Sequence, residues 1–318
     1  MDILFQILLW VSVAAIFHSY VLFPFIIKIL AKNKAENGTV YNKNDDLPIV
    51  SILMSLYNEE EVIEEKLQTI FDSDYPANKV EIIIGSDNSN DETNNIVNKI
   101  KENHPNLHFT EFKARQGKPG VINKLYPQAK GSILILTDAN VLFEKNTIFE
   151  LVKHFKYTEI GLTDSRMINT KESIDKKGIS VQESSYITRE VKIKRNESIN
   201  WGAMMGPFGG CYAIRTELYS EVPNNFLVDD FFINMSVLSQ GKKAINNVKA
   251  VVYEDVSDNL KEEFRRKLRI STGNFQNLFT FSNLLFGKAG ISFCFFSHKV
   301  LRWFGPFFLI IVLFSNIF

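Results

Sequence analysis

Acidic, amide and basic side chains occur in this sequence at spacings typical of phosphate chemistry. Asp138 and Asn140 are two residues apart at the end of an apolar run. Their oxygens are hard ligands of the kind that Mg²⁺ or Mn²⁺ prefers, and such an ion can bridge phosphate groups. Lys118 lies between Gly117 and Gly120, where its ammonium can bind a phosphate. These residues predict a site for a diphosphate and a divalent cation.

A further pair of carboxylates, Asp229 and Asp230, lies within the apolar stretch 226–232. The simpler interpretation is that the pair caps the start of a helix. Adjacent carboxylates close to a third, Asp138, also raise one another's pKa, which suits a general base. Both interpretations can hold together, so Asp229 and Asp230 are the candidate catalytic residues.

Four basic residues lie within positions 265–269, and two of them, Arg266 and Arg269, are three residues apart. On a helix this spacing places both side chains on one face. One interpretation is a helix face that lies on a membrane surface. The other is a clamp for a departing diphosphate. One helix can serve both purposes, and the two interpretations stay open.

The candidate residues follow a regular alternation of apolar strands and helices. We expect strands at 49–56, 80–85, 107–112 and 132–137, and helices at 59–71, 91–100 and 121–126. Uninterrupted apolar strands that alternate with helices predict a parallel, doubly wound sheet. Ligands bind outside the carboxyl ends of such strands. The loops 55–59, 85–89, 115–120 and 137–140 are therefore expected to converge.

Any one of these loops, taken alone, is more simply explained as a turn built from Asn and Asp. Together they favour a nucleotide site, in which Tyr57 stacks on a base and Asp87 accepts a hydrogen bond from the base imide. In the second half of the chain we expect helices at 148–155, 179–199 and 229–238. We also expect strands at 160–167, 211–214 and 244–253.

The two ends of the chain are apolar and predict membrane segments. Residues 1–31 are long enough for a transmembrane helix, and 32–47 form a polar linker. Lys28, Lys32 and Lys34 follow the apolar core, so the positive-inside rule places the next domain in the cytoplasm. We expect a catalytic domain at 48–258, amphipathic interfacial helices at 259–290 and a membrane-associated segment at 291–318. The run 303–318 is marginal for spanning, which favours a truncated piece of a longer protein over a short helix.

Composition excludes several other classes of protein. Lys plus Arg and Asp plus Glu both number 36, so the net charge of zero gives no support to a nucleic-acid partner. The two cysteines lack the spacing of a zinc site or a disulfide scaffold. Without GxGxxG or a Walker A motif, a dehydrogenase of the Rossmann type and a P-loop nucleotidase are disfavoured.

The ordered set of motifs resembles the family 2 glycosyltransferases over roughly residues 48–272. The resemblance rests on the whole series rather than on any single motif: Tyr57-Asn58-Glu59, Asp87, Gly117-Lys118, Asn123, Asp138-Ala-Asn140, Gly209-Gly210-Cys211, Asp229-Asp230 and Arg266-x-x-Arg269. It implies a GT-A fold: an α/β, Rossmann-like domain with a mostly parallel mixed sheet, here with N- and C-terminal transmembrane or interfacial helices. It also implies inversion at the anomeric carbon, as in cellulose, chitin and hyaluronan synthases.

The resemblance further implies a role for each matching residue. The nucleoside, most often uridine, would be held by Tyr57, Glu59 and Asp87, and the diphosphate by Lys118. Asp138 would begin the DxD metal motif, Asp230 would be the base of the TED motif, and Arg269 the arginine of QxxRW. Residues lining the acceptor entrance would be Phe208, Gly209, Gly210 and Cys211.

Three departures from the family pattern change what we expect of metal binding and of the acceptor. Asn140 replaces the second aspartate of DxD, which weakens metal binding or shifts it to Asp138. Asp229 replaces the glutamate of TED, a mild change. Ile270 and Arg266 stand where QxxRW has tryptophan and glutamine, respectively. Because that tryptophan is a platform for the acceptor sugar, a lipid-linked or short acceptor competes with a long polysaccharide.

The sequence thus predicts a membrane enzyme that transfers sugar from a nucleotide-diphosphate sugar with Mg²⁺ or Mn²⁺. The partners expected are a donor, a saccharide or lipid-linked acceptor and the bilayer of the cell (inner) membrane, with no nucleic acid. Two alternatives remain at this stage. One is a non-catalytic nucleotide-sugar-binding subunit of a polysaccharide assembly complex, and the other is a nucleotidyltransferase.

Overall fold

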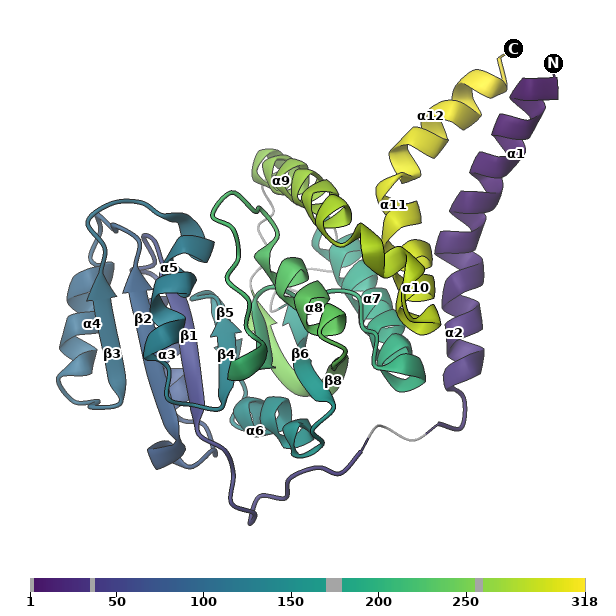
Figure 1. Ribbon diagram of the computed structural model, residues 1–318. Coiled ribbons are helices and arrows are strands. Elements are labelled where there is room, and N and C mark those ends of the chain that lie inside the picture. The colour runs from purple at the N-terminus through teal and green to yellow at the C-terminus, as the bar shows by residue number, and fades with distance from the viewer. Residues whose placement is uncertain (1–2, 35–37, 170–178, 255–259, 318) are drawn as a thin grey trace.

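Four apolar runs in the first half of the chain form the parallel part of an eight-stranded sheet (Figure 1). The computed structural model describes residues 3–34, 38–169, 179–254 and 260–317. The four strands are β1 (Val50–Leu56), β2 (Val80–Ser86), β3 (Leu107–Glu111) and β4 (Ile133–Thr137). Strand β1 pairs in parallel with β2 and β4, and β2 with β3. Both faces of the central strands are buried, which explains their uninterrupted apolar sequences.

The second half of the sheet is mixed, as expected, and its order completes the series β3-β2-β1-β4-β7-β6-β8-β5. Its strands are β5 (Val141–Phe143), β6 (Ile160–Asn169), β7 (Cys211–Arg215) and β8 (Lys243–Glu254). Strand β7 runs antiparallel to β4 and β6, β5 runs antiparallel to β8, and β6 is parallel to β8. The short strand β5 was not expected, because three residues after a turn carry no readable alternation.

Helices cover both faces of the sheet. One face packs against α3 (Ile63–Phe71), α4 (Thr93–Lys101) and α6 (Thr147–Val152). The other face packs against α5 (Gly117–Leu125), α7 (Ile179–Trp201) and α8 (Asp229–Ser239). Neighbouring residues of β1 divide between these two cores, Leu53 into the second and Met54 into the first.

The N-terminal apolar segment forms one long helical rod. It consists of α1 (Ile3–Phe17), a π-helical turn at His18–Leu22 and α2 (Phe23–Ala31). Within the described residues, Ile3–Ala31 is the one unbent helix long and apolar enough to cross a membrane. A second, bent pair meets the same test only as a whole: Ala289–Trp303 and Gly305–Ser315 meet at 57°.

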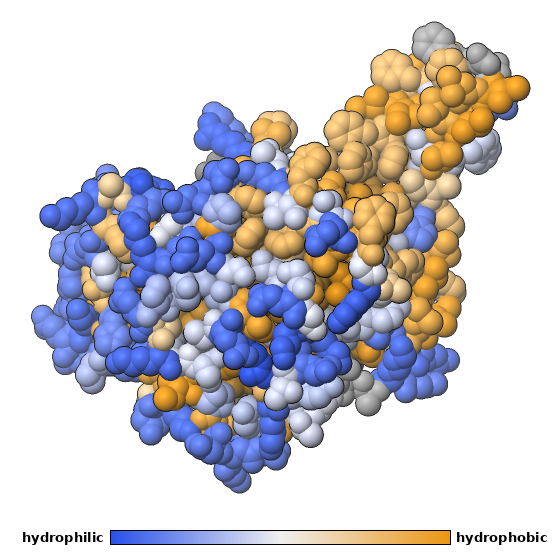
Figure 2. Space-filling view, in the orientation of Figure 1, coloured by the Kyte–Doolittle hydropathy of each residue, from blue (hydrophilic) through white to orange (hydrophobic). Residues whose placement is uncertain are grey.

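The C-terminal segment returns alongside the N-terminal rod. It contains α10 (Ala289–Cys294), a π-helical turn (Phe295–Val300), α11 (Leu301–Trp303) and α12 (Gly305–Ser315). Helices α1 and α12 lie side by side and project from the rest of the molecule (Figure 1). Figure 2 shows that this projection carries a nearly continuous apolar surface, which includes Trp10 of α1 and Phe307 and Leu313 of α12.

The terminal apolar helices and the sheet share a buried core. Phe23 and Ile27 of α2 and Phe295 of the C-terminal segment are fully buried in the cluster that also contains α8. His298 lies between two carboxylates of α7, with Nε2 at 2.9 Å from Glu190 and Nδ1 at 2.6 Å from Glu197. The two parts of the molecule are therefore joined by packing as well as by the chain.

The basic amphipathic segment is one long helix, α9 (Leu260–Thr280), followed by a 3₁₀ turn at Ser282–Phe286. It was expected to be a pair of helices. Its apolar side chains Phe264, Leu268 and Phe279 are exposed. The predicted boundary between the catalytic domain and this helix, at 258, falls outside the described residues, whereas β1 begins at Val50 and β8 ends at Glu254.

Candidate active site

The loops that follow β1 and β2 are held together by their own asparagines. Asn58 and Asn88 both adopt left-handed backbone conformations, with φ of 55° and 62°, which asparagine tolerates better than most residues. The Asn58 side-chain oxygen accepts a hydrogen bond from the Asn90 amide at 3.0 Å, and the Asn58 amide donates to Ser89 at 3.2 Å. These polar residues therefore build turns and also bring the two loops to one edge of the sheet.

Asp87 organises the part of the candidate site that we expect to bind the nucleoside. Its carboxylate is 2% exposed and accepts hydrogen bonds from the Gln116 amide at 2.6 Å and the Gly117 amide at 2.9 Å. Arg115 Nε donates to the same carboxylate at 3.1 Å, and the Arg115 guanidinium lies 3.2 Å from the centre of the Tyr57 ring. Asp87 thus anchors the loop that carries Lys118, in addition to its expected role toward the base.

Arg115 is a residue that the sequence argument did not single out. It covers the Tyr57 ring on which we expected a base to stack. An arginine one residue before a Gln-Gly-Lys turn gives no signal of its own, because its partners lie on two other loops. The contacts of Arg115 with Tyr57 and Asp87 become visible only in the structure, where the loops after β1 and β2 meet the loop before α5.

Lys118 lies among the carboxylates because helix α5 begins earlier than expected. The sequence predicted a helix from Val121, but α5 starts at Gly117, which has a φ of 76°. A proline and glycines in this segment hid the first turn. Lys118 Nζ donates to Asp138 Oδ1 at 2.7 Å and lies 3.8 Å from Asp229 Oδ2. Although burial opposes the charged form, Asp138 and Asp229 raise the pKa of Lys118 overall.

The turn between β4 and β5 presents Asp138 and Asn140. The Asp138 amide donates to the Gly210 carbonyl at 3.0 Å, which fixes the turn to the start of β7. The Asn140 side-chain amide donates to Glu254 Oε1 at 3.2 Å. The Asp138 carboxylate, the Asn140 side-chain amide and the Glu254 carboxylate therefore lie around this turn.

Asp229 and Asp230 form the first turn of α8, as expected. A carboxylate there interacts favourably with the helix dipole. The Phe231 amide donates to Asp230 Oδ1 at 2.8 Å. Burial, followed by repulsion from Asp229, raises the pKa of Asp230 to about 6. Asp230 can therefore change protonation near neutral pH.

The acceptor-side loop approaches Asp230 closely. A side-chain carbon added at Gly209 would lie 2.9 Å from Asp230 Oδ2, so only glycine fits here without displacing the carboxylate. Phe208 and Gly210 line the same cavity as Asp230. Cys211, by contrast, is fully buried in β7 and does not line the cavity.

Glu59 lies near the Asp138 turn from the side of β1. Its amide donates to Thr93 Oγ1 at 2.8 Å. Burial and then the negative charge of Asp138 raise the pKa of the Glu59 carboxyl to about 7. This electrostatic interaction connects the nucleoside end of the site with the Asp138 turn.

A cavity of about 500 Å³ is lined by part of the predicted set of site residues. Tyr57, Glu59, Asp87 and Asn140 are not among the described residues that line it. It lies between the sheet, α7, α8, α9 and α11. Its charged lining residues are Lys118, Asp138, Glu190, Lys194, Asp229, Asp230, Glu254, Arg266, Arg269 and Lys299. Arg266 and Arg269 therefore face the same space, and Arg269 donates to the Leu227 carbonyl at 3.1 Å. Of the two open interpretations for these arginines, contact with a bound substrate is supported by this placement.

An aromatic residue from outside the expected motif also lines this cavity. Ile270, which stands at the tryptophan position of the expected motif, lines the cavity. Trp303 of α11, which lies outside that motif, lines it as well. The Trp303 ring packs edge-on against Phe231, with ring centres 5.3 Å apart. A tryptophan is thus present beside Asp230, although it comes from the C-terminal segment rather than from α9.

The Phe208 loop rests on buried charges that the sequence argument missed. Asp164 of β6 is fully buried and accepts a hydrogen bond from the Phe208 amide at 3.1 Å. Lys194 of α7 lies 3.3 Å from Asp164 and 3.6 Å from the centre of the Phe208 ring. Burial raises the pKa of Asp164, although Lys194 opposes this shift. The feature of the sequence that could have indicated these buried charges is Asp164 itself, a single aspartate within a buried strand.

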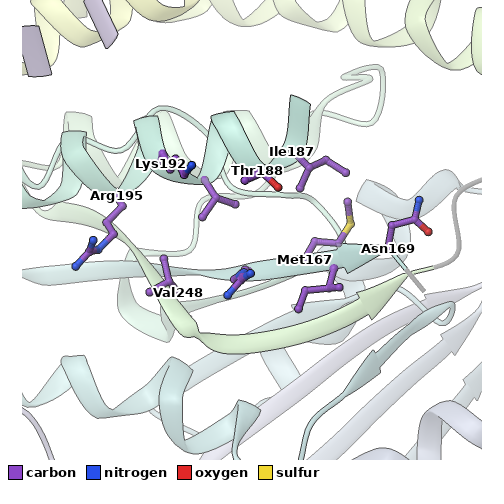
Figure 3. A pocket seen from close by; sticks show the side chains of 10 residues that line it. Met167, Asn169, Ile187, Thr188, Lys192, Arg195 and Val248 are labelled. Carbon is purple, nitrogen blue, oxygen red and sulfur yellow. The ribbon is translucent and has the colours of Figure 1, made fainter. Parts of the chain in front are cut away.

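A smaller cavity of about 300 Å³ lies beside the first and shares Met167 with it. Figure 3 shows Lys192 and Arg195 of α7 across from Val248 of β8. No carboxylate is among the described residues that line it. Of the two, the larger cavity alone combines acids, bases and cations in the manner required for group transfer.

Comparison with known families identifies this arrangement. Residues 51–221 match the model of Glycosyl transferase family 2, and residues 183–318 match that of Glycosyl transferase family group 2. A relative from Bacillus subtilis, the probable glycosyltransferase YdaM, is 24% identical over 238 residues, 72% of this chain and 56% of the relative. The chain therefore spans little more than half of that protein.

A second relative is the poly-β-1,6-N-acetyl-D-glucosamine synthase of Staphylococcus aureus. It is 30% identical over 157 residues, which cover 49% of this chain and 37% of the synthase. Among solved structures, the mannosyltransferase PcManGT from Pyrobaculum calidifontis, in complex with GDP-Man and Mn²⁺, superimposes with a TM-score of 0.80 at 22% identity. That superposition covers 98% of this chain and 85% of the other, and it shows a shared GT-A fold. With the first family model matching more than half of its residues, this chain belongs to glycosyltransferase family 2.

Proposed function

We propose that this glycosyltransferase moves a sugar from a nucleotide-diphosphate sugar, with inversion, to a saccharide or lipid-linked acceptor at the cytoplasmic face of the membrane. The observation that carries the proposal is the single cavity shared by Lys118, Asp138, Asp230 and Arg269. It combines a base with cations suited to a diphosphate. The name of the Staphylococcus aureus relative supports a polysaccharide acceptor.

The reaction proposed is a single displacement. Asp230 takes the proton of the acceptor hydroxyl, and the resulting oxygen attacks the anomeric carbon from the side opposite the diphosphate. Lys118 and Arg269 stabilise the negative charge that develops on the leaving diphosphate, and such electrostatic stabilisation is usually the largest catalytic term. The raised pKa of Asp230 makes its carboxylate a stronger base than an ordinary aspartate.

The residues around the Asp138 turn fit a divalent cation. Asp138 and Asn140 offer hard oxygens, and Asp138 already holds a cation, the Lys118 ammonium, at 2.7 Å. Among the described residues no three His, Cys, Asp or Glu side chains form a complete metal cage. This suits Mg²⁺ or Mn²⁺ held partly by substrate phosphates. When bound, the ion would neutralise charge on the diphosphate.

The nucleoside end of the proposed site consists of Tyr57, Glu59 and Asp87, together with Arg115. We propose uridine as the nucleoside, following the family pattern of these motifs. The neighbour PcManGT was solved with GDP-Man, so guanosine is the alternative to be tested directly.

The acceptor end of the cavity adjoins the membrane segments. Lys299 and Trp303 line it, and both belong to the helices that return along α1 and α2. We propose that the acceptor enters from this side and contacts Phe208, Gly209 and Gly210. Lys28, Lys32 and Lys34 at the end of the N-terminal rod support the cytoplasmic placement of the catalytic domain, residues 48–258.

The experiment that tests the function uses membranes or detergent-purified full chain and a panel of UDP- and GDP-sugars. We expect one donor to release its nucleoside diphosphate and to label a saccharide or a lipid fraction. Nucleotide-sugar binding without release or transfer would instead support a non-catalytic subunit. Incorporation of the donor's α-phosphate would indicate a nucleotidyltransferase.

A further inference from the structure

A lysine occupies a core position of helix α3. Ile63, Lys66, Leu67 and Ile70 form the buried face of this helix, and Lys66 is 0% exposed. The spacing of these residues is that of an apolar stripe, in which leucine or methionine would fill the place of Lys66. Burial of an ammonium is unfavourable unless its N–H groups find partners, so the contacts of Lys66 indicate why it is there.

All the polar contacts of the Lys66 ammonium lie on the β4–β5 segment. Nζ donates to Thr137 Oγ1 at 2.8 Å and to the carbonyl of Val141. It also lies 3.7 Å from the centre of the Phe143 ring. Within the described part of the chain, Lys66 forms no ion pair with a carboxylate. The ammonium is therefore bound by backbone, hydroxyl and ring groups.

These contacts fix both ends of one turn. Thr137 precedes and Val141 follows the residues Asp138, Ala139 and Asn140. The Thr137 hydroxyl in turn donates to the Gly210 carbonyl at 3.0 Å, the same carbonyl that accepts the Asp138 amide. Lys66 thus reaches, through one hydroxyl, the glycine loop that packs against the candidate base.

We propose that Lys66 is a positioning residue that holds the Asp138–Asn140 turn in the shape that binds the divalent cation and the donor diphosphate. The inference rests on the proposed function and deepens it. Lys66 acts from the opposite side of the turn and does not contact the substrate. If Lys66 is removed, the Thr137 hydroxyl and the Val141 carbonyl lose their donor, and the turn relaxes away from the cavity.

A purely space-filling role makes a different prediction. If only packing mattered, an apolar side chain of equal length would serve as well, and replacement of a buried charge by such a group is often neutral or stabilising. Lys66→Met therefore separates the two roles. It keeps the approximate volume of the side chain and removes the N–H groups that donate to Thr137 and Val141.

The test measures Mn²⁺ binding by titration calorimetry on the full chain in detergent, with UDP or GDP present. We expect Lys66→Met to melt at or above the wild-type temperature and to bind Mn²⁺ about 10–100-fold more weakly, the range found when groups that orient metal ligands are removed. Thr137→Val, which removes one partner of Lys66, should weaken binding in the same direction. The double variant should lose less than the sum of both changes.

Leu67→Ala is the matched control, because it opens a hole in the same buried face and leaves the ammonium intact. We expect it to lower the melting temperature and to bind Mn²⁺ as the wild type does. Wild-type Mn²⁺ affinity in both Lys66→Met and Thr137→Val would overturn the role of Lys66, as would equal weakening by Leu67→Ala. A wild-type protein that binds neither UDP nor GDP with Mn²⁺ would instead refute the proposed function.

Discussion

At the scale of single residues, the proposed chemistry depends on two adjacent carboxylates with different surroundings. Asp229 lies 3.8 Å from Lys118, whereas Asp230 is shielded by the Phe208 loop and Phe231. Because burial and Asp229 both disfavour its charged form, Asp230 has the higher proton affinity expected of a base.

Replacement of Asp230 by asparagine should remove turnover while the protein still folds. We expect kcat to fall about 10²–10⁴-fold, the usual contribution of a general base. Donor binding should persist, because the amide is nearly isosteric with the carboxyl. Diphosphate release measured beside Asp72→Asn, a change on the exposed end of α3, checks the effect. If the Asp230→Asn variant turned over at the wild-type rate, Asp230 would not be the general base.

The pH profile of kcat/KM should report the same group. A base with a pKa near 6 is protonated and inactive below that pH, so the rate should rise through about pH 6 and then level. Asp229→Asn removes the repelling charge, lowers the pKa of Asp230 and should move this acidic limb to lower pH. Burial and the charge of Asp138 raise the pKa of Glu59 to about 7, so Glu59→Gln serves as the control for its contribution. If the acidic limb of the pH profile did not move in Asp229→Asn, the Asp229 charge would not be the cause of the raised pKa of Asp230.

At the scale of elements, different helices supply the groups that one sequence motif was expected to hold. Helix α9 contributes Arg266 and Arg269 to the cavity, but the aromatic ring comes from α11. We infer that Trp303 takes the place for which Ile270 is unsuited, since a flat ring can pack against the apolar face of a sugar. No motif in the sequence indicated this, because Ile270 and Trp303 lie more than thirty positions apart.

Trp303→Ala should therefore affect the acceptor more than the donor. We expect the KM for the acceptor to rise about tenfold, in line with the 1–3 kcal/mol per stacked ring measured for other planar ligands. The KM for the donor should change little, and Trp303→Phe should retain most of the activity. Trp10→Ala, on the exposed surface of α1, is the control for effects on membrane packing. Equal changes in both KM values would argue for a structural role alone.

The sequence predicted the structure best where the pattern of a single strand or helix is sufficient. The parallel strands were readable as apolar runs, and Asp229 and Asp230 lie at the helix start that was expected. Helix α5 was predicted too short because Gly117 and Pro119 resemble a loop. Arg115 and Lys66 were missed because their importance comes from partners on other elements, and a one-dimensional pattern does not encode such pairs.

At the scale of the whole molecule, the sheet and the terminal apolar helices share one packed core (Figure 1). The lining of the larger cavity comes from both parts. A ligand bound there contacts both parts and opposes their separation. Ligand binding to the folded state alone stabilises it by mass action.

The melting temperature should accordingly rise with nucleotide and metal together. We expect UDP or GDP with Mn²⁺ to protect the full chain, and excess EDTA to abolish most of that protection, because Asp138 would hold the ion and the ion would neutralise charge on the diphosphate. Differential scanning fluorimetry in detergent provides the measurement, with Asp138→Asn as the variant that should lose the metal-dependent part. If the rise in melting temperature were the same with and without EDTA, the proposed metal site at Asp138 would be contradicted.

The bend of 57° between Ala289–Trp303 and Gly305–Ser315 has a consequence for the environment of the enzyme. Trp303 is the last residue before that bend and lines the cavity, while α12 beyond it has exposed apolar side chains. Helices in a bilayer change their tilt when the thickness of the hydrocarbon layer changes. We therefore propose that acyl-chain length affects the width of the cavity beside Trp303, and with it the way in which the proposed acceptor is held.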